Sequence, residues 1–141
     1  MTINNRFRDA ISKSVELEKR GEHAPAVELS DEAIAGAIRD GDVRWIRTLC
    51  HHAAIMSRSA EDRASAKRYY EQSLASDPEN ARALYGLAAI ALHENDFVTA
   101  RQYATRCHMS MLRSDDEILK AGLLDLIEKN WPDLAEKSGG H

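Results

Sequence analysis

The sequence predicts an all-α protein in which one helical unit is repeated along the chain. Small and apolar residues recur about every 34 residues, a spacing typical of repeat proteins. Aromatic residues make up 6% of the chain and alanine is frequent, which suits close helix packing better than a sandwich or a barrel. The positions in phase are Cys50 with Leu84 and Ile118, Ala53 with Leu87 and Ala121, Ala54 with Ala88 and Gly122, Ala66 with Ala100, Tyr69 with Tyr103, and Ser73 with Cys107.

Apolar residues at helical spacing predict about seven helices. Gly21 ends the first helix, and Pro25 lies where a first-turn proline is tolerated in the second. Asp42 can cap the third helix. The helices are expected at about residues 7–20, 25–39, 43–58, 63–76, 79–94, 97–113 and 115–130.

The later boundaries rest on similar local signals. Asp77-Pro78-Glu79 separates two helices, because the residue before a proline avoids the helical region and proline itself suits a first turn. Asn95-Asp96 forms the next turn. Ser114 with Glu117 has the form of a capping box and is expected to open the last helix, which Trp131-Pro132 closes.

Length and charge limit the class of protein. A chain of 141 residues that is 43% hydrophobic has the size and the apolar content for one domain. Its net charge of −4 gives no overall attraction for nucleic acid or an anionic membrane. The chain has no apolar stretch long enough to span a bilayer, and its first residues lack the apolar run of a secretory signal. We therefore expect a cytoplasmic protein without a membrane partner.

Cysteine and histidine patterns do not favour a catalytic or metal site. Cys50 and Cys107 lie among small apolar neighbours on predicted helix faces, so we interpret both as buried thiols. Adjacent His51 and His52 point about 100° apart on a helix, which is a poor arrangement for one metal ion. A zinc site or a Cys/His nucleophile would need partners from separate helices. The sequence shows no phosphate loop or nucleophile elbow, and it predicts no enzyme activity, metal or cofactor.

The chain resembles the tetratricopeptide repeat (TPR) family over about residues 7–131. The family unit is a pair of antiparallel helices of about 34 residues. The second half of a unit is matched by Ala66, Tyr70, Ser73 and Pro78, the first half of the next by Leu84, Leu87 and Ala88, and the turn within a unit by 95–97 with Ala100 and by 21–23 with Ala26.

The resemblance implies a right-handed superhelical stack of antiparallel helix pairs, a TPR-like α-solenoid. We expect one domain at 1–134, with repeats near 7–40, 44–80 and 81–114, a capping helix at 115–130 and a disordered tail at 135–141. Ala26 and Ala66 are separated by several residues more than one period, so the first pair or the link at Gly41 is expected to be elongated.

The resemblance also implies a binding surface, because the first helix of each TPR pair lines a concave groove. Alternatively, the last helix or an N-terminal segment that includes Ile3 covers the apolar positions of this surface. The residues expected at or near the groove are Ile11, Val15, Thr48, His51, His52, Ile55, Arg82, Tyr85, Ala89, Leu119 and Leu123.

These observations together predict a non-enzymatic protein interaction module that binds a peptide or helix of a partner in its groove. The alternative is a scaffold unit that forms a homodimer through an exposed apolar side of the last helix, made of Leu119, Leu123 and Ile127. Nucleic-acid binding is not favoured. The basic cluster around the fourth helix lacks free aromatic residues, because the repeat pattern assigns Tyr69 and Tyr70 to packing.

Overall fold

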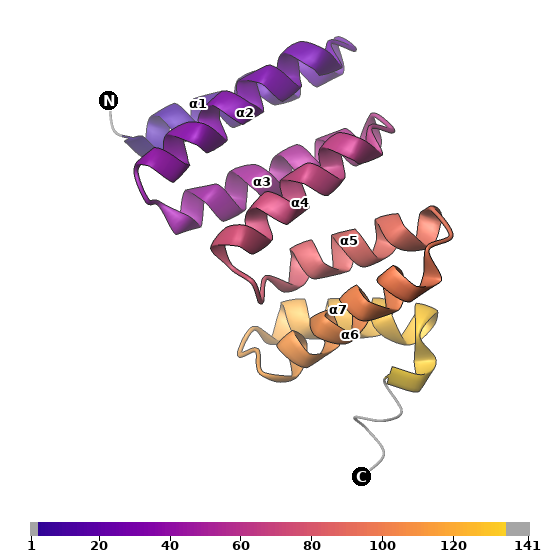
Figure 1. The fold of residues 1–141 in the computed structure, drawn as a ribbon. Coiled ribbons are helices and arrows are strands. Elements are labelled where there is room, and N and C mark those ends of the chain that lie inside the picture. The colour runs from indigo at the N-terminus through magenta and orange to yellow at the C-terminus, as the bar shows by residue number, and fades with distance from the viewer. Residues whose placement is uncertain (1–2, 135–141) are drawn as a thin grey trace. The chain divides into compact units, whose positions relative to one another are not determined.

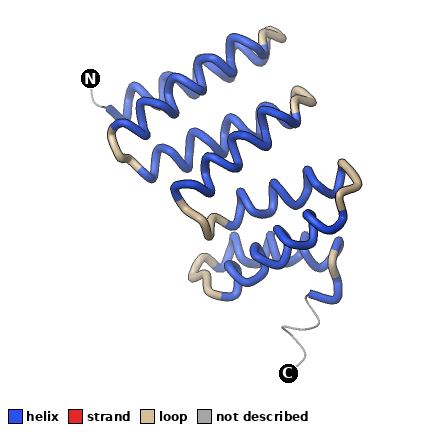
Figure 2. The backbone as a smooth tube through the Cα atoms, in the orientation of Figure 1, coloured by secondary structure: helices blue, strands red, loops and turns tan. Residues whose placement is uncertain are grey.

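The computed structural model describes residues 3–134, with side chains from residue 6 onward, and this part of the chain consists of helices joined by short connections (Figures 1 and 2). Neither a strand nor a cis peptide bond occurs among the described residues, which confirms the all-α prediction. The tail predicted at 135–141 lies outside them. The helices are α1 (Ile3–Lys19), α2 (His23–Arg39), α3 (Val43–Ser59), α4 (Arg63–Ser76), α5 (Ala81–His93), α6 (Phe97–Leu112) and α7 (Glu117–Asn130), followed by a helical turn at 132–134.

The chain divides into two compact units, Met1–Pro78 and Glu79–His141. In the first unit each helix packs against the next one along the chain, and α1 also contacts α3 directly. The second unit repeats this pattern, with α5 on α6, α6 on α7, and a direct contact between α5 and α7. Both units are therefore built from packed antiparallel helix pairs, as the TPR-like fold class predicts. That residues 1–134 form a single domain stays a prediction.

A single turn type recurs between helices. Before α2, α3, α4 and α6, the residue that precedes the N-cap has a positive φ, with values of 76° at Gly21, 66° at Gly41, 62° at Glu61 and 63° at Asn95. The next backbone N–H then donates back to a carbonyl five residues earlier, at 2.8–3.0 Å. This is the hydrogen bond that closes a left-handed helix end. The same geometry therefore recurs at these four connections, and the chain enters α2, α3, α4 and α6 in the same way.

Aspartate side chains cap most of the helices that follow these turns. Asp42 accepts a hydrogen bond from the N–H of Trp45 at 3.2 Å, so its predicted role as a cap is confirmed. Asp62 and Asp96 cap α4 and α6 in the same way. Each cap satisfies a backbone donor that would otherwise lack a partner in the first helical turn.

The additional residues lie in α2, which belongs to the first pair as predicted, and in α3, which does not, whereas the link at Gly41 is not elongated. Both α2 and α3 have 17 residues, whereas α4 has 14 and α5 has 13. The connecting turns before α4 and α6 have the same length, so the extra residues are helical rather than looped. About one additional turn in each of α2 and α3 therefore explains the wide spacing of Ala26 and Ala66.

Small buried side chains allow the paired helices to approach closely. Ala26, Ala66 and Ala100 lie in the first turns of α2, α4 and α6 and are at most 2% exposed. Cys50 and Cys107 are also fully buried, and burial raises the pKa of each thiol to about 12. Both thiols are therefore protonated at neutral pH, as expected for packing residues rather than nucleophiles.

His23 joins the two helix pairs of the first unit. Its Nδ1 is 2.6 Å from Oε1 of Glu18 on α1, and its Nε2 is 2.8 Å from Oδ2 of Asp62, the cap of α4. Burial lowers the pKa of His23, but the hydrogen bonds with Asp62 and Glu18 and the charges of both carboxylates outweigh it, so the pKa lies above its ordinary value. The imidazolium form donates to both carboxylates at once.

We expect His23→Gln to reduce the free energy of unfolding more at pH 6 than at pH 8.5. Because the folded pKa is raised, the contribution of His23 is fully present below the unfolded pKa and is lost as the pH rises through the folded value. The loss at pH 6 should be about 1 kcal/mol, the upper end for a partly exposed ion pair. Urea denaturation followed by circular dichroism measures it, with exposed His93→Gln as the control. An equal loss at both pH values would contradict the charged bridge.

Candidate functional site

The predicted groove residues of the first unit lie on α1 and α3. Ile11 and Val15 on α1 are half-buried, and so are His51 and His52 on α3. Thr48 is exposed, with its hydroxyl donating to the carbonyl of Arg44 at 2.9 Å. Ile55 keeps 42% of its surface exposed, which is unusual for isoleucine on a helix that is buried on its other side.

The structure brings two of these residues together. Ile11 and His52 line one small cavity, whose other walls come from α1, α2 and α3. Ser14 and Ser30 also line it, and their hydroxyl oxygens lie 3.4 Å apart. Burial lowers the pKa of His52, so this imidazole is neutral at physiological pH. A neutral imidazole beside an isoleucine adds to an apolar surface rather than to a charged one.

In the second unit the predicted residues lie on α5 and α7. Arg82 is exposed, whereas Tyr85 and Ala89 are half-buried along the same side of α5. On α7, Leu119 is half-buried and Leu123 is buried, at 8% exposure. Leu123 therefore packs inside the unit instead of lying on an open surface.

The position of Leu123 follows from the register of α7. Asn80 caps α5 and Asp116 caps α7, which places the two caps 36 residues apart rather than 34. The two additional residues lie in α6, which has 16 residues where α4 has 14. Measured from the caps, Leu123 corresponds to Leu87, and Ile127 to Ala91, and all four are buried.

Three expectations about α7 are therefore wrong. Ile118 does not correspond to buried Leu84, since it is 89% exposed. Ser114 does not cap α7; its hydroxyl accepts from the N–H of Asp116, and Asp116 is the cap. Leu119, Leu123 and Ile127 do not form an exposed apolar side, because Leu123 and Ile127 are buried. The 34-residue period fails here because it assumes a constant helix length.

The corrected register identifies residues that the sequence analysis missed. On α7 the positions equivalent to Arg82, Tyr85 and Ala89 are Ile118, Ala121 and Asp125, and all three are exposed. On α1 the residue equivalent to Thr48 is exposed Arg8. Spacing measured between the capping residues Asn80 and Asp116 would have found the α7 residues. We call Arg8, Ile11, Val15, Thr48, His51, His52 and Ile55 the unit-1 strip, and Arg82, Tyr85, Ala89, Ile118, Ala121 and Asp125 the unit-2 strip.

Comparison with known families supports this architecture. Residues 57–106 match a family model described as tetratricopeptide repeat. The resemblance to this family that the sequence predicts is thus confirmed over these residues. The match runs from the end of α3 through α4 and α5 into α6, so it includes the helices with the regular period. Searches of curated proteins and of solved structures found no significant match. Tetratricopeptide repeats are generally protein interaction modules.

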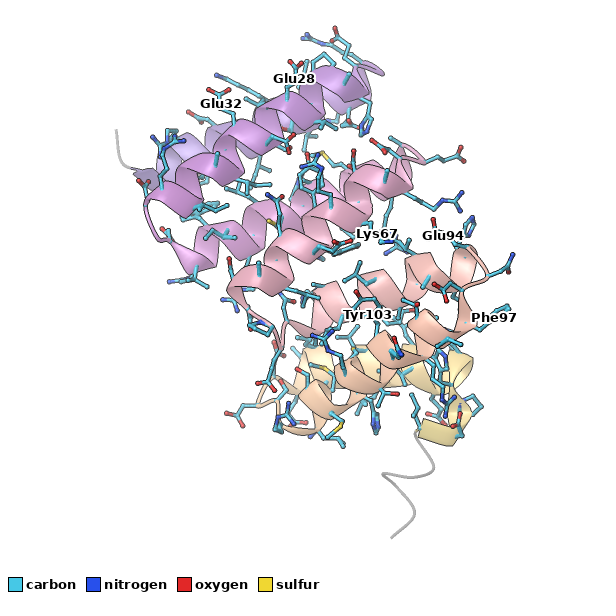
Figure 3. All side chains as sticks on the ribbon, viewed as in Figure 1. Glu28, Glu32, Lys67, Glu94, Phe97 and Tyr103 are labelled. Atoms are coloured by element: carbon cyan, nitrogen blue, oxygen red, sulfur yellow. The ribbon has the colours of Figure 1, made fainter. Side chains whose placement is uncertain are left out.

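Within residues 3–134 no group of three or more His, Cys, Asp and Glu side chains is placed to hold a metal ion. None of the helices in this range is both long and apolar enough to cross a membrane. Exposed apolar side chains also occur away from the strips, as at Phe97, which projects from the start of α6 (Figure 3).

The open surroundings of Gly122 predict that this position tolerates larger side chains. No atom lies within 4 Å of a β-carbon built on Gly122, so Gly122→Ala should stabilise the protein by about 0.5–1 kcal/mol through helix propensity. Gly122→Leu should be nearly neutral. By contrast, Ala88→Leu at a fully buried position should destabilise it by about 1–3 kcal/mol. Urea denaturation measures all three, and equal losses for the two leucine variants would restore the 34-residue register.

Proposed function

We propose that the chain is a non-enzymatic interaction module that binds an amphipathic peptide or helix of a partner protein. The observation that carries this proposal is the exposure of Ile55 and Ile118, at 42% and 89%, on the strips of the two units. Ile55 lies on the first helix of a pair, the helix that lines the binding surface in tetratricopeptide repeats, and Ile118 lies on α7, which follows the last pair. Exposed isoleucines beside other apolar residues favour contact with an apolar partner surface.

The chemistry of the strips suggests what the partner carries. The unit-1 strip combines the apolar side chains of Ile11, Val15 and Ile55 with one permanent positive charge at Arg8 and no carboxylate. It therefore suits a segment with a row of apolar residues and an acidic residue at one side. The unit-2 strip contains Arg82 and Asp125 and has no charge excess, so apolar contact rather than charge would dominate binding there.

Ile55→Asp is the sharpest test for the unit-1 strip. A buried, unpaired carboxylate at an apolar contact should weaken partner binding at least tenfold, or about 1.4 kcal/mol. The matched control is Ile38→Asp on α2, because Ile38 is 50% exposed and lies off the strip. Partners are captured from lysate of the source organism with immobilised protein, and the affinity of each captured polypeptide is then titrated. Equal affinities of Ile55→Asp and Ile38→Asp would contradict the proposal.

Ile118→Asp tests the unit-2 strip separately. Since Ile118 is almost fully exposed, the substitution should leave the free energy of unfolding within about 0.5 kcal/mol. The same captured partner should bind Ile118→Asp several-fold more weakly than Val98→Asp, the control at another highly exposed residue of this unit. If both variants bind like the unaltered chain, the unit-2 strip does not contribute. Light scattering over a dilution series checks whether the partner is a second copy of the chain.

A further inference from the structure

The described residues of the first unit also form a cleft away from the unit-1 strip. It lies between α1 and α2 and has a volume of about 260 Å³. Since successive helical residues are rotated by about 100°, the α1 residues of this cleft face nearly away from Ile11 and Val15. The residues that line it are Arg6, Phe7, Asp9, Ala10 and Lys13 of α1 with Leu29, Glu32, Ala33, Gly36 and Arg39 of α2.

Two arginine side chains converge at one end of the cleft. The Nη2 of Arg6 and the Nη2 of Arg39 approach the same point, 3.5 Å and 3.6 Å from where a β-carbon of Gly36 would stand. Phe7 reaches that point too, with its Cε1 at 3.6 Å. Because Gly36 has no side chain, both guanidinium groups can lie close to its backbone.

The two guanidinium groups differ in their partners. Arg6 lies over the ring of Phe7, 4.8 Å from its centroid, and pairs with Asp40 at 3.1 Å. Arg39 makes no ion pair or side-chain hydrogen bond with the described residues. Asp40 therefore pairs with Arg6 alone, and the charge of Arg39 at this end of the cleft is left without a carboxylate partner among the described residues.

The remaining lining defines the ligand further. Apolar atoms of Ala10, Leu29 and Ala33 cover the cleft between its ends, so they suit a hydrocarbon group. Asp9 and Glu32 also border it, and Glu32 is labelled on α2 in Figure 3. Their charges repel a dianion such as phosphate but still permit a single negative charge at the arginines. The volume lies below the range for drug-sized ligands and suits a smaller molecule.

We propose that this cleft binds a small apolar group that carries one carboxylate, with the carboxylate at Arg6 and Arg39 and the hydrocarbon over Ala10 and Ala33. Guanidinium groups match the planar carboxylate and donate paired hydrogen bonds to it. Either a free carboxylic acid or the last residue of a peptide has this chemistry. The site is separate from both strips, so it does not depend on the proposed interaction function.

The test compares matched probes on the full chain by ¹H–¹⁵N NMR titration. N-acetyl-leucine and octanoate represent a peptide end and a free acid, and N-acetyl-leucinamide is the uncharged twin of the first. We expect at least one acid to shift the amide signals of α1 and α2 that line the cleft and to bind at least fivefold more tightly than the amide. The acid that binds more tightly identifies the source of the ligand. No shifts from either acid, or equal binding of acid and amide, would overturn the proposal.

Variants locate the carboxylate. Arg39→Gln should weaken binding of the acid at least fivefold, whereas Arg63→Gln, an exposed arginine of the same unit outside the cleft, should not change it. Equal affinities of these two variants would also overturn the assignment. Since the probe comparison uses the unaltered chain, the proposal remains testable even if Arg39→Gln folds poorly.

Discussion

The close approach of paired helices at small residues is the constraint on which both units depend. Ala26, Ala66 and Ala100 each lie four residues after a capping residue and donate a backbone hydrogen bond to its carbonyl, at 3.3, 3.1 and 3.0 Å. Because these alanines are buried, any larger side chain would push the second helix away from the first. The contact thus fixes where along its length each even-numbered helix meets its partner.

The open faces follow from this contact and from the recurring turn. Within each pair, a left-handed residue and the N-cap that follows it set the same rotation, so the same side of α1, α3 and α5 is directed into the pair. The residues on the opposite side of these helices belong to the strips defined above. Ile55 on α3 is exposed for this reason, and Ile118 is exposed near the start of α7.

The sequence predicted the helix pairs well, because glycine, proline and aspartate signals act within a few residues. The sixth helix was expected at 97–113 and lies at Phe97–Leu112, but the surface of α7 was still placed by the 34-residue period. The error of two residues then moved the expected surface of α7 to Leu119 and Leu123. A period found in the middle of the chain carries no information about an insertion near its end. Caps give a better reference, because each one fixes a helix start directly.

The cleft between α1 and α2 shows a second kind of limit. Arg6 and Arg39 are far apart in sequence, and each would be interpreted as an ordinary charge at the end of a surface helix. Only antiparallel pairing brings them together over Gly36, whose lack of a side chain is visible in the sequence but has no meaning there without the partner helix. Because the cleft faces nearly away from the unit-1 strip on α1, a ligand in one does not sterically block the other. The cleft and the small cavity beside Ile11 and His52 share Ala10 of α1 and Ala33 of α2, so coupling between the cleft and the strip would pass through these two alanines.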